Sequence, residues 1–536
     1  MNLSIIQQEL CVVLTGVLIL LLDLFTPAVH KAKLGWLGIV SLALILISGL
    51  GETPAIKPGD QVITDNTAST LEVRYTQSHT GKLTCVDATG NEVIVNEADA
   101  RRAGFQGSIT QDELAGFFKA LFLVAAIFVL FMGVDFAERL RTGIGEFYSL
   151  ICFALAGMMF AASAANFVML FVAIELITIT FYVLTSFQRH RMRSLEAGVK
   201  YLILGAAASA LMVYGIALIY GTTGSMSFNT LRIDPADQSQ IFNLGLLMVL
   251  SGLGFKIAAF PFQIWAPDVY QGAPAPVTAF LAIGSKAAGV VLLLRLVHAS
   301  AEAHTALLWP LLPWLSGATI AYGSLCAIRQ RNLKRLLGYA GIASAGYLLL
   351  GVVALQGGGD QLSTEGYQAI LYYLAGYLLA MIAAFVVICR VTREANDEDL
   401  DVLAGLHQRS PLMATVLTLA IVSLAGIPPL AGFLGKFLLL KPIIGAAGEG
   451  AAYVGLIIVA LLGVIVSLYY YFGVVREIYW STGLLPDAQP EKLPAFDLDW
   501  PTRLALVGCG LALIGLGIFP EPLLEWADRA VSVFPN

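Results

Sequence analysis

Two lysines stand inside apolar stretches of the chain, on either side of a segment rich in proline and glycine. Lys256 lies in LSGLGFKIAAF and Lys286 lies in AFLAIGSKAAGVVLLL. A lysine at the centre of a membrane-length apolar run costs about 2.5–3.5 kcal/mol to insert, so it normally faces a bundle interior or a water-filled cavity. Pro261 has no N–H and leaves the carbonyl of Ile257 without a helical partner. A buried lysine beside an interrupted helix is typical of an ion site in a transporter.

A third lysine, Lys436, follows a pair of prolines in LAGIPPLAGFLGKFLLL. Pro428 and Pro429 leave the carbonyls of Leu424 and Ala425 without helical partners. Two apolar segments interrupted by glycine and proline, five spans apart, are the pattern of an inverted repeat. We therefore expect two related halves, whose lysines lie off-centre on opposite sides of the membrane midplane.

Two further charged residues complete the candidate set. Glu175 lies in the middle of NFVMLFVAIELITITFYVL, and Lys200 lies near the start of LEAGVKYLILGAAASALMVYG. Desolvation disfavours the charged form of a buried lysine and a nearby carboxylate favours it, so a lysine subject to both can load and release a proton. The competing interpretations are a structural carboxylate for Glu175, a buried ion pair without transport for Lys256 and Lys286, and snorkelling to the membrane surface for Lys200. Ionisable groups inside a membrane default to function, so we favour proton transport for all but Lys200, where both interpretations stay open.

Three polar residues nearby have simpler interpretations. Asp268, in APDVYQGAPAPV, is expected to cap a turn. Lys334 and Arg335 follow a basic loop directly, and they are expected to anchor the start of a span at the membrane surface.

The composition predicts an all-α polytopic membrane protein. Of 536 residues, 58% are hydrophobic and only 13% are charged, whereas a soluble domain has about 25% charged residues. The mean hydropathy is +0.79. Windows of about 20 apolar residues predict about fourteen spans. They lie at roughly 9–28, 34–50, 114–134, 146–163, 166–187, 197–220, 241–263, 277–298, 307–327, 335–355, 367–390, 412–441, 452–475 and 503–520.

Lysine and arginine gather in the loops after odd-numbered spans, for example RHRMR (189–193) and RQRNLKR (329–335). The positive-inside rule places these loops in the cytoplasm, so both termini are expected on the periplasmic side of a bacterial inner membrane. Residues 51–112 are polar and alternate with a period of two in TLEVRY, KLTCV and NEVIV. This pattern predicts a small external β-hairpin or meander, which we interpret as a cap or a subunit contact.

The sequence offers no evident redox centre. The six cysteines include no CxxC pair, and the six histidines lie in loops or at the ends of predicted helices. An iron–sulfur framework, a zinc site or a pair of axial haem ligands inside the membrane is therefore not expected.

Several motifs together carry a resemblance to a known family. GLGFKIAAFPFQIWAPDVYQGAPAPVTAFLAIGSK resembles the signature of subunit N of the bacterial proton-translocating NADH–quinone oxidoreductase, respiratory complex I. LFVAIELITITFYVL, SLEAGVKYLILGAAASALMVYGIALIYGTTGS, RNLKRLLGYAGIASAGYLL and LAGIPPLAGFLGKF are similar to further family motifs, in order, over roughly residues 145–480. Subunits L and M and the Mrp-type antiporter subunits usually carry a WLPxAM…PTPVSA…LIH-like stretch where this chain has APDVYQGAPAPV.

The resemblance implies fourteen helices with two inverted five-helix repeats that contain discontinuous helices. It implies a proton path through Glu175, Lys256, Lys286 and Lys436, with Lys200 nearby. It also implies that this chain binds no cofactor, and that NADH, FMN, iron–sulfur clusters and quinone belong to partner subunits. The partners would be other membrane-arm subunits of complex I, including neighbouring antiporter-like subunits, and the lipid bilayer, but no nucleic acid.

The chain departs from the family pattern in two places. The 51–112 insert is longer than the usual loop, and Ser344 stands where many relatives have a histidine. The expected divisions are 1–50 for two helices, 51–112 for the insert, 113–145 for the third helix and a cytoplasmic loop, 146–298 and 307–475 for the repeats, 476–502 for a cytoplasmic loop and 503–536 for the last helix and an external tail.

Other function classes compete with a complex I subunit. The closest alternative is a subunit of a related cation/proton antiporter or of a membrane-bound hydrogenase. A stand-alone secondary transporter and a structural subunit without conduction are more distant alternatives. Co-purification with native partners would separate a complex I subunit, an antiporter or hydrogenase subunit and a stand-alone transporter. Only in complex I would the purified complex contain flavin and oxidise NADH.

Overall fold

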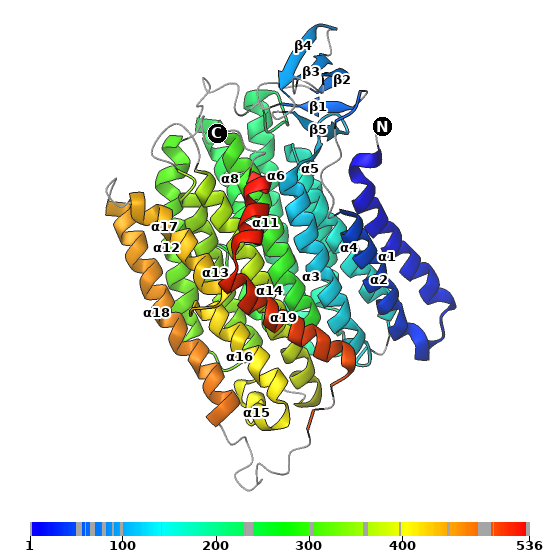
Figure 1. Ribbon diagram of the computed structural model, residues 1–536, viewed down its shortest axis with the longest axis vertical. Helices are drawn as coiled ribbons and strands as arrows, with labels where there is room; N and C mark the ends of the chain where they lie inside the picture. Colours follow the sequence, from blue (N-terminus) through cyan, green and yellow to red (C-terminus); the bar gives the residue numbers. More distant parts are fainter. Residues whose placement is uncertain are drawn as a thin grey trace.

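The fold is a helical bundle with a small sheet at one end, beside the start of α1 (Gln7–Phe25) (Figure 1). A computed structural model describes residues 3–49, 56–58, 60–64, 70–77, 82–87, 90–96, 100–140, 142–229, 231, 240–300, 305–356, 363–395, 398–446, 451–480, 495–496 and 498–531. Within these residues, twelve helical segments are long and apolar enough to cross a membrane. The all-α membrane class is therefore confirmed.

The remaining helices follow in chain order. They are α2 (Leu34–Gly49), α3 (Glu113–Ala137), α4 (Ile144–Ser163), α5 (Phe167–Thr185), α6 (Met192–Thr223), α8 (Gln240–Ile257), α9 (Trp265–Gly272), α10 (Ala275–Phe280), α11 (Lys286–Ser300), α12 (Thr305–Ala327), α13 (Leu333–Val353), α14 (Thr364–Ala395), α15 (Leu406–Arg409), α16 (Pro411–Ala425), α17 (Ala431–Gly445), α18 (Ala451–Trp480), α19 (Trp500–Ile518) and α20 (Glu521–Val531).

Two of the fourteen predicted spans are not among those twelve segments. The span predicted at 412–441 is divided into α16 and α17, each of 15 residues, because Pro428 and Pro429 stop the first helix. The span predicted at 307–327 corresponds to α12, a 23-residue helix with Pro310 and Pro313 inside it.

The helices that carry the candidate lysines are interrupted. Lys256 lies in the last turn of α8, and the chain turns at Ala258, whose φ is +60°, before α9 begins. The indole N–H of Trp265 donates to the carbonyl of Phe255 across this turn, at 2.9 Å. Between α10 and α11 the helix takes a π-helical turn at Leu281–Ser285, immediately before Lys286. The interruption beside Lys256 was expected from Pro261, whereas the π-helical turn was not.

The predicted β structure at 51–112 is confirmed, and it is larger than a hairpin. Six antiparallel strands pair in the order β4-β3-β2-β1-β5-β6. They are β1 (Gln61–Ile63), β2 (Leu71–Gln77), β3 (Lys82–Val86), β4 (Glu92–Asn96), β5 (Arg101–Gly104) and β6 (Ile109–Gln111). Val62, Leu71, Val73, Leu83 and Cys85 form its buried core. The amide of Asn229 donates to the carbonyl of Thr64 at 3.0 Å, which ties the sheet to the bundle.

The side of the membrane on which the sheet lies is testable by labelling. Ile94 in β4 is 67% exposed, whereas Leu83 in β3 is fully buried. From the distribution of basic loops we expect a membrane-impermeant maleimide to label an Ile94→Cys variant in intact cells. A Leu83→Cys variant should react only after denaturation, and the unsubstituted chain gives the background of the native cysteines. Labelling of Ile94→Cys only in opened cells would contradict the proposed orientation.

Candidate functional site

The first part of the site joins α5, α6 and α8. The Lys256 side chain is buried, and its ammonium donates to the hydroxyl of Thr178, one turn along α5 from Glu175. The carboxylate of Glu175 accepts a hydrogen bond from Ser209 of α6. Thr178 rather than Glu175 therefore receives the hydrogen bond from Lys256, while the Glu175 charge attracts the ammonium electrostatically.

Aromatic and hydroxyl groups lead from Lys256 towards Lys286. The Lys256 ammonium lies 5.7 Å from the ring centroid of Tyr201. The hydroxyl of Tyr201 lies near that of Ser285, the residue directly before Lys286, and both hydroxyls are buried. A Cβ added at Gly289 would come within 3.2 Å of the Lys256 Cβ, so the glycine lets α11 approach α8 closely at this point. The two lysines thus lie on closely packed helices but donate to different groups.

Lys286 is only 2% exposed, and it is held by neutral groups. Its ammonium donates to the carbonyl of Gly341 in α13 at 2.5 Å, and the hydroxyl of Tyr377 in α14 lies 3.4 Å away. The ring centroid of Tyr377 is 5.1 Å from the same nitrogen. Carbonyl, hydroxyl and aromatic ring together solvate the ammonium without a carboxylate contact.

Lys436 is also buried, and its ammonium reaches back across the interruption between α16 and α17. It donates to the carbonyls of Leu424 and Ala425, at 2.8 and 3.1 Å. These are the carbonyls that the prolines were expected to leave unpaired, and that expectation is confirmed. The nitrogen also lies 5.1 Å from the ring centroid of Tyr347 in α13.

Lys200 lies in a different environment. Its side chain is 42% exposed and pairs with Glu196, at 2.8 Å, and with Asp268 of α9, at 2.6 Å. The second carboxylate oxygen of Asp268 accepts from Arg335 of α13 at 2.5 Å. Burial alone would raise the pKa of Asp268, but the hydrogen bonds from Lys200 and Arg335 outweigh burial and hold that pKa below its usual range. Asp268 is thus a bridge between α6 and α13 rather than only a turn cap.

The expectation that Lys334 anchors the membrane surface is wrong. Its side chain is buried, and its ammonium donates to the carbonyl of Ala273 at 2.7 Å, where α9 gives way to α10. The same nitrogen pairs with Glu398 at 2.9 Å. The position of Lys334 beside a basic loop suggested an exposed anchor, and no sequence pattern indicated that its side chain points into the bundle.

Comparisons with known proteins agree with this geometry. The family model for NADH:quinone oxidoreductase/Mrp antiporter membrane subunits matches residues 164–465. NADH-quinone oxidoreductase subunit N of Desulfitobacterium hafniense is 41% identical over 446 residues, 80% of this chain and 87% of that protein. The subunit N of Trichlorobacter lovleyi is 34% identical over 543 residues, 99% of this chain and 97% of that protein. The chain belongs to the subunit N family of NADH–quinone oxidoreductases.

A solved structure supports the same assignment. A chain of respiratory complex I from Thermus thermophilus is 30% identical, with a TM-score of 0.71 over 97% of this chain and 99% of that chain. The fold and the resemblance described from the sequence are thereby confirmed for this member of the subunit N family.

The subunit N chain holds a second set of buried charges that sequence reasoning missed. Lys119 of α3 pairs with Glu9 of α1 at 2.7 Å, and both side chains are buried. At the start of α3, Asp112 accepts two hydrogen bonds from Arg295 of α11, at 2.8 and 3.0 Å. Glu9 stands at the edge of the first predicted span and is 110 positions from Lys119, so no local pattern links the two.

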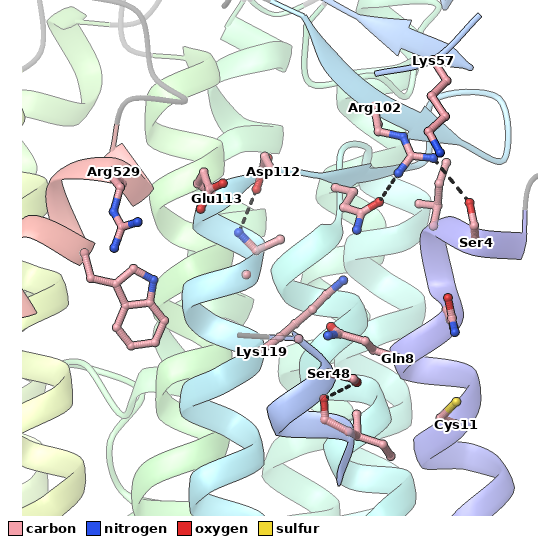
Figure 2. A pocket seen from close by; sticks show the side chains of 18 of the residues that line it. Ser4, Gln8, Cys11, Ser48, Lys57, Arg102, Asp112, Glu113, Lys119 and Arg529 are labelled. Carbon is pink, nitrogen blue, oxygen red and sulfur yellow. Dashed lines mark hydrogen bonds between the residues drawn. The ribbon is translucent and has the colours of Figure 1, made fainter. Parts of the chain in front are cut away.

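Lys119 and Asp112 line a cavity of about 610 Å³ between α1, α2, α3, α20 and the sheet. Figure 2 shows the Lys119 side chain extending from α3 towards α1, with Ser4, Gln8 and Cys11 on the α1 side and Arg529 opposite. The pair therefore stands where the first helices, the sheet and the last helix meet, which favours a structural role.

Loss of one partner of this pair should destabilise the subunit. Lys119→Met leaves Glu9 buried without its cation, which typically costs about 3–5 kcal/mol. We expect a clear fall in the thermal unfolding midpoint of the purified complex, and partial recovery in the Glu9→Gln/Lys119→Met double variant. Lys441→Met is the matched control, because Lys441 pairs with Glu365 at 3.2 Å on the surface, where both side chains are more than half exposed. Such a pair contributes about 0–1 kcal/mol, so equal losses in Lys119→Met and Lys441→Met would contradict a structural role for the buried pair.

Proposed function

We propose that this chain is a proton-translocating membrane-arm subunit of an NADH:quinone oxidoreductase, and that Glu175, Lys256, Lys286 and Lys436 carry the protons. One observation supports the relay above all. Lys256, Lys286 and Lys436 are buried at helix interruptions, and each ammonium is hydrogen-bonded to hydroxyl or carbonyl oxygens. Neutral acceptors stabilise a charged amine without fixing its proton as a carboxylate would, so these lysines are suited to load and release protons.

The buried basic groups outside this row differ in kind. Lys119 pairs with Glu9, Lys334 pairs with Glu398, and Arg295 pairs with Asp112. A carboxylate partner favours the charged form and holds the proton in place. We assign these three pairs to the scaffold, and we leave Lys200, which is half exposed between two carboxylates, outside the core of the relay.

The energy for translocation must come from partner subunits. Moving one charge across the membrane takes about 2.3 kcal/mol per 100 mV. In this proposal NADH oxidation and quinone reduction, with FMN and iron–sulfur clusters, take place in those partners, and neighbouring antiporter-like subunits pass the conformational or electrostatic signal. Glu175 suits an input position, because it is only partly buried and lies between α5 and α6, whose outer faces carry exposed residues such as Ile179 and Ile203.

The environment follows from the same family and from the charge pattern. We place the subunit in the bacterial inner membrane, with the basic loops in the cytoplasm and with the sheet and both termini on the periplasmic side. The sheet and α20, which leads to the C-terminus, line the same cavity at Lys119 and therefore lie at the same end of the bundle. This shared position supports the proposed arrangement.

Replacing Lys256 by arginine separates proton transfer from charge alone. The guanidinium keeps the positive charge but does not release a proton in proteins, because its pKa is above about 12. We expect Lys256→Arg to assemble at the normal subunit ratio and to lower proton pumping at least about a hundredfold, the lower end of the losses when an acid–base group is removed. NADH oxidation should fall with pumping wherever the two are coupled. Pumping and subunit content are measured in membrane vesicles that contain the whole complex.

Two variants control this experiment. Lys441→Arg tests the same exchange at an exposed pair and should keep normal pumping. Lys256→Ala is a poorer probe, since it removes the charge as well and leaves Glu175 without its attraction. A Lys256→Arg complex that assembles and pumps at the wild-type rate would eliminate Lys256 as an obligatory proton carrier.

A further inference from the structure

Helices α13 and α14 lie between Lys286 and Lys436, and they present three polar positions along the gap. Gly341 of α13 accepts from Lys286, and the Tyr347 ring of the same helix lies beside Lys436. Ser344 stands midway between them, on the same helix face. Its hydroxyl donates to the carbonyl of Ala340, at 3.0 Å. The serine proton is therefore engaged within its own helix.

Two tyrosines of α14 span this gap. Tyr377 contacts Lys286 through its hydroxyl, at 3.4 Å. Tyr373 lies one turn earlier on the same helix, and its ring packs on Gly435, the residue directly before Lys436. The two rings stack with their centroids 6.3 Å apart, and both side chains are buried. One helix face thus places the Tyr377 hydroxyl beside Lys286 and the Tyr373 side chain beside the residue that precedes Lys436.

The surrounding groups form a connected polar patch. The Tyr373 hydroxyl lies within reach of the hydroxyl of Ser344, and the Tyr373 ring stacks on the ring of Tyr377. Buried hydroxyls are satisfied by hydrogen bonds to one another or to ordered water. Packing alone does not account for this choice of residues, because phenylalanine would fill the same space without burying an O–H group.

We propose that the hydroxyls of Tyr377 and Tyr373 carry the proton between Lys286 and Lys436 in this chain. This inference rests on the proposed lysine relay and names the groups that complete it. In the step, an Nζ–H bond of Lys286 breaks and an O–H bond forms on Tyr377, while the original Tyr377 proton passes to Tyr373 directly or through one water. The Tyr373 proton then moves in the same way to the neutral amine of Lys436. Each tyrosine ends neutral, with one proton gained and one lost, so no oxidant or reductant is required.

Phenylalanine substitutions test the hydroxyls without removing the rings. Tyr373→Phe, Tyr377→Phe and the double variant keep the packing of both rings and the contact of the Tyr377 ring with Lys286, so the complex should assemble normally. We expect the double variant to lower the rate of proton pumping at least about a hundredfold, as for other removed proton-transfer groups, and NADH oxidation should fall with it wherever the two are coupled. Tyr372→Phe is the matched control, since it lies on the same helix and loses a buried hydrogen bond to the carbonyl of Leu516, at 2.6 Å, away from both lysines. It should pump normally.

A rescue separates proton transfer from a merely structural role. Ser344→His in the double phenylalanine background places a titratable ring midway between the lysines and should restore most of the lost pumping. If pumping stays low in that variant although the complex assembles, the hydroxyls do not act as proton carriers. Single phenylalanine variants answer the same question should the double variant fail to assemble.

Arginine variants of the lysines distinguish this inference from the proposed relay. If Lys286→Arg and Lys436→Arg complexes pump at the wild-type rate, the lysine relay itself is wrong. If those variants lose pumping while the double phenylalanine variant keeps it, the relay stands and the tyrosine link is overturned. Loss in both sets, with recovery in Ser344→His, supports both.

Discussion

A charged amine inside a low-dielectric bundle must be compensated, and the kind of compensation decides what the amine can do. Among the described residues, five lysines are buried within the helices, and they divide into two groups. Lys119 and Lys334 face the carboxylates of Glu9 and Glu398. The other three, Lys256, Lys286 and Lys436, face hydroxyl and carbonyl oxygens. Removing a proton from the first group strands a buried anion, whereas removing one from the second group leaves a neutral site. The same side chain is therefore held as a fixed ion pair in one place, and in another it has the surroundings that we propose for a mobile proton site.

Each of the three lysines lies at a helix interruption, and at Lys436 the interruption itself supplies the neutral acceptors. In a regular helix each carbonyl is occupied by an N–H four residues on, and it is poorly available to a side chain. The prolines after α16 free the two carbonyls that bind Lys436, and the π-helical turn before α11 brings Lys286 to the carbonyl of Gly341. Helix α8 instead ends one residue after Lys256, and the Lys256 ammonium donates to the hydroxyl of Thr178. Backbone irregularity and proton site are thus parts of one arrangement.

Features that depend on local sequence patterns could be predicted, whereas contacts between helices that are distant in the sequence could not. The three relay lysines are visible because each breaks a long apolar run, and proline marks two of the interruptions. The alternating segment at 51–112 predicted strands, although their number depended on pairing that the sequence does not encode locally. Lys334 was misjudged because its position after a basic loop says nothing about the direction of its side chain. Tyr373 and Tyr377 resemble ordinary packing residues within an apolar run, and only their positions beside Lys286 and Gly435 give them a chemical meaning.

Helix α13 contacts the Asp268 bridge, Lys286 and Lys436. At its start, Arg335 binds the Asp268 bridge to α6 and Lys334 holds the carbonyl at the α9–α10 junction. Two turns later Gly341 accepts from Lys286, and Tyr347 then lies beside Lys436. Helix α9 follows the interruption at Lys256 and is bound to α13 through Asp268 and Arg335. A shift of α9 would therefore displace α13, and with it the Gly341 carbonyl that binds Lys286. Packed helices transmit such shifts because their cores do not deform continuously. The ion bridge at Asp268, although it stands outside the row of buried lysines, thus joins α6 of the first predicted repeat to α13 of the second.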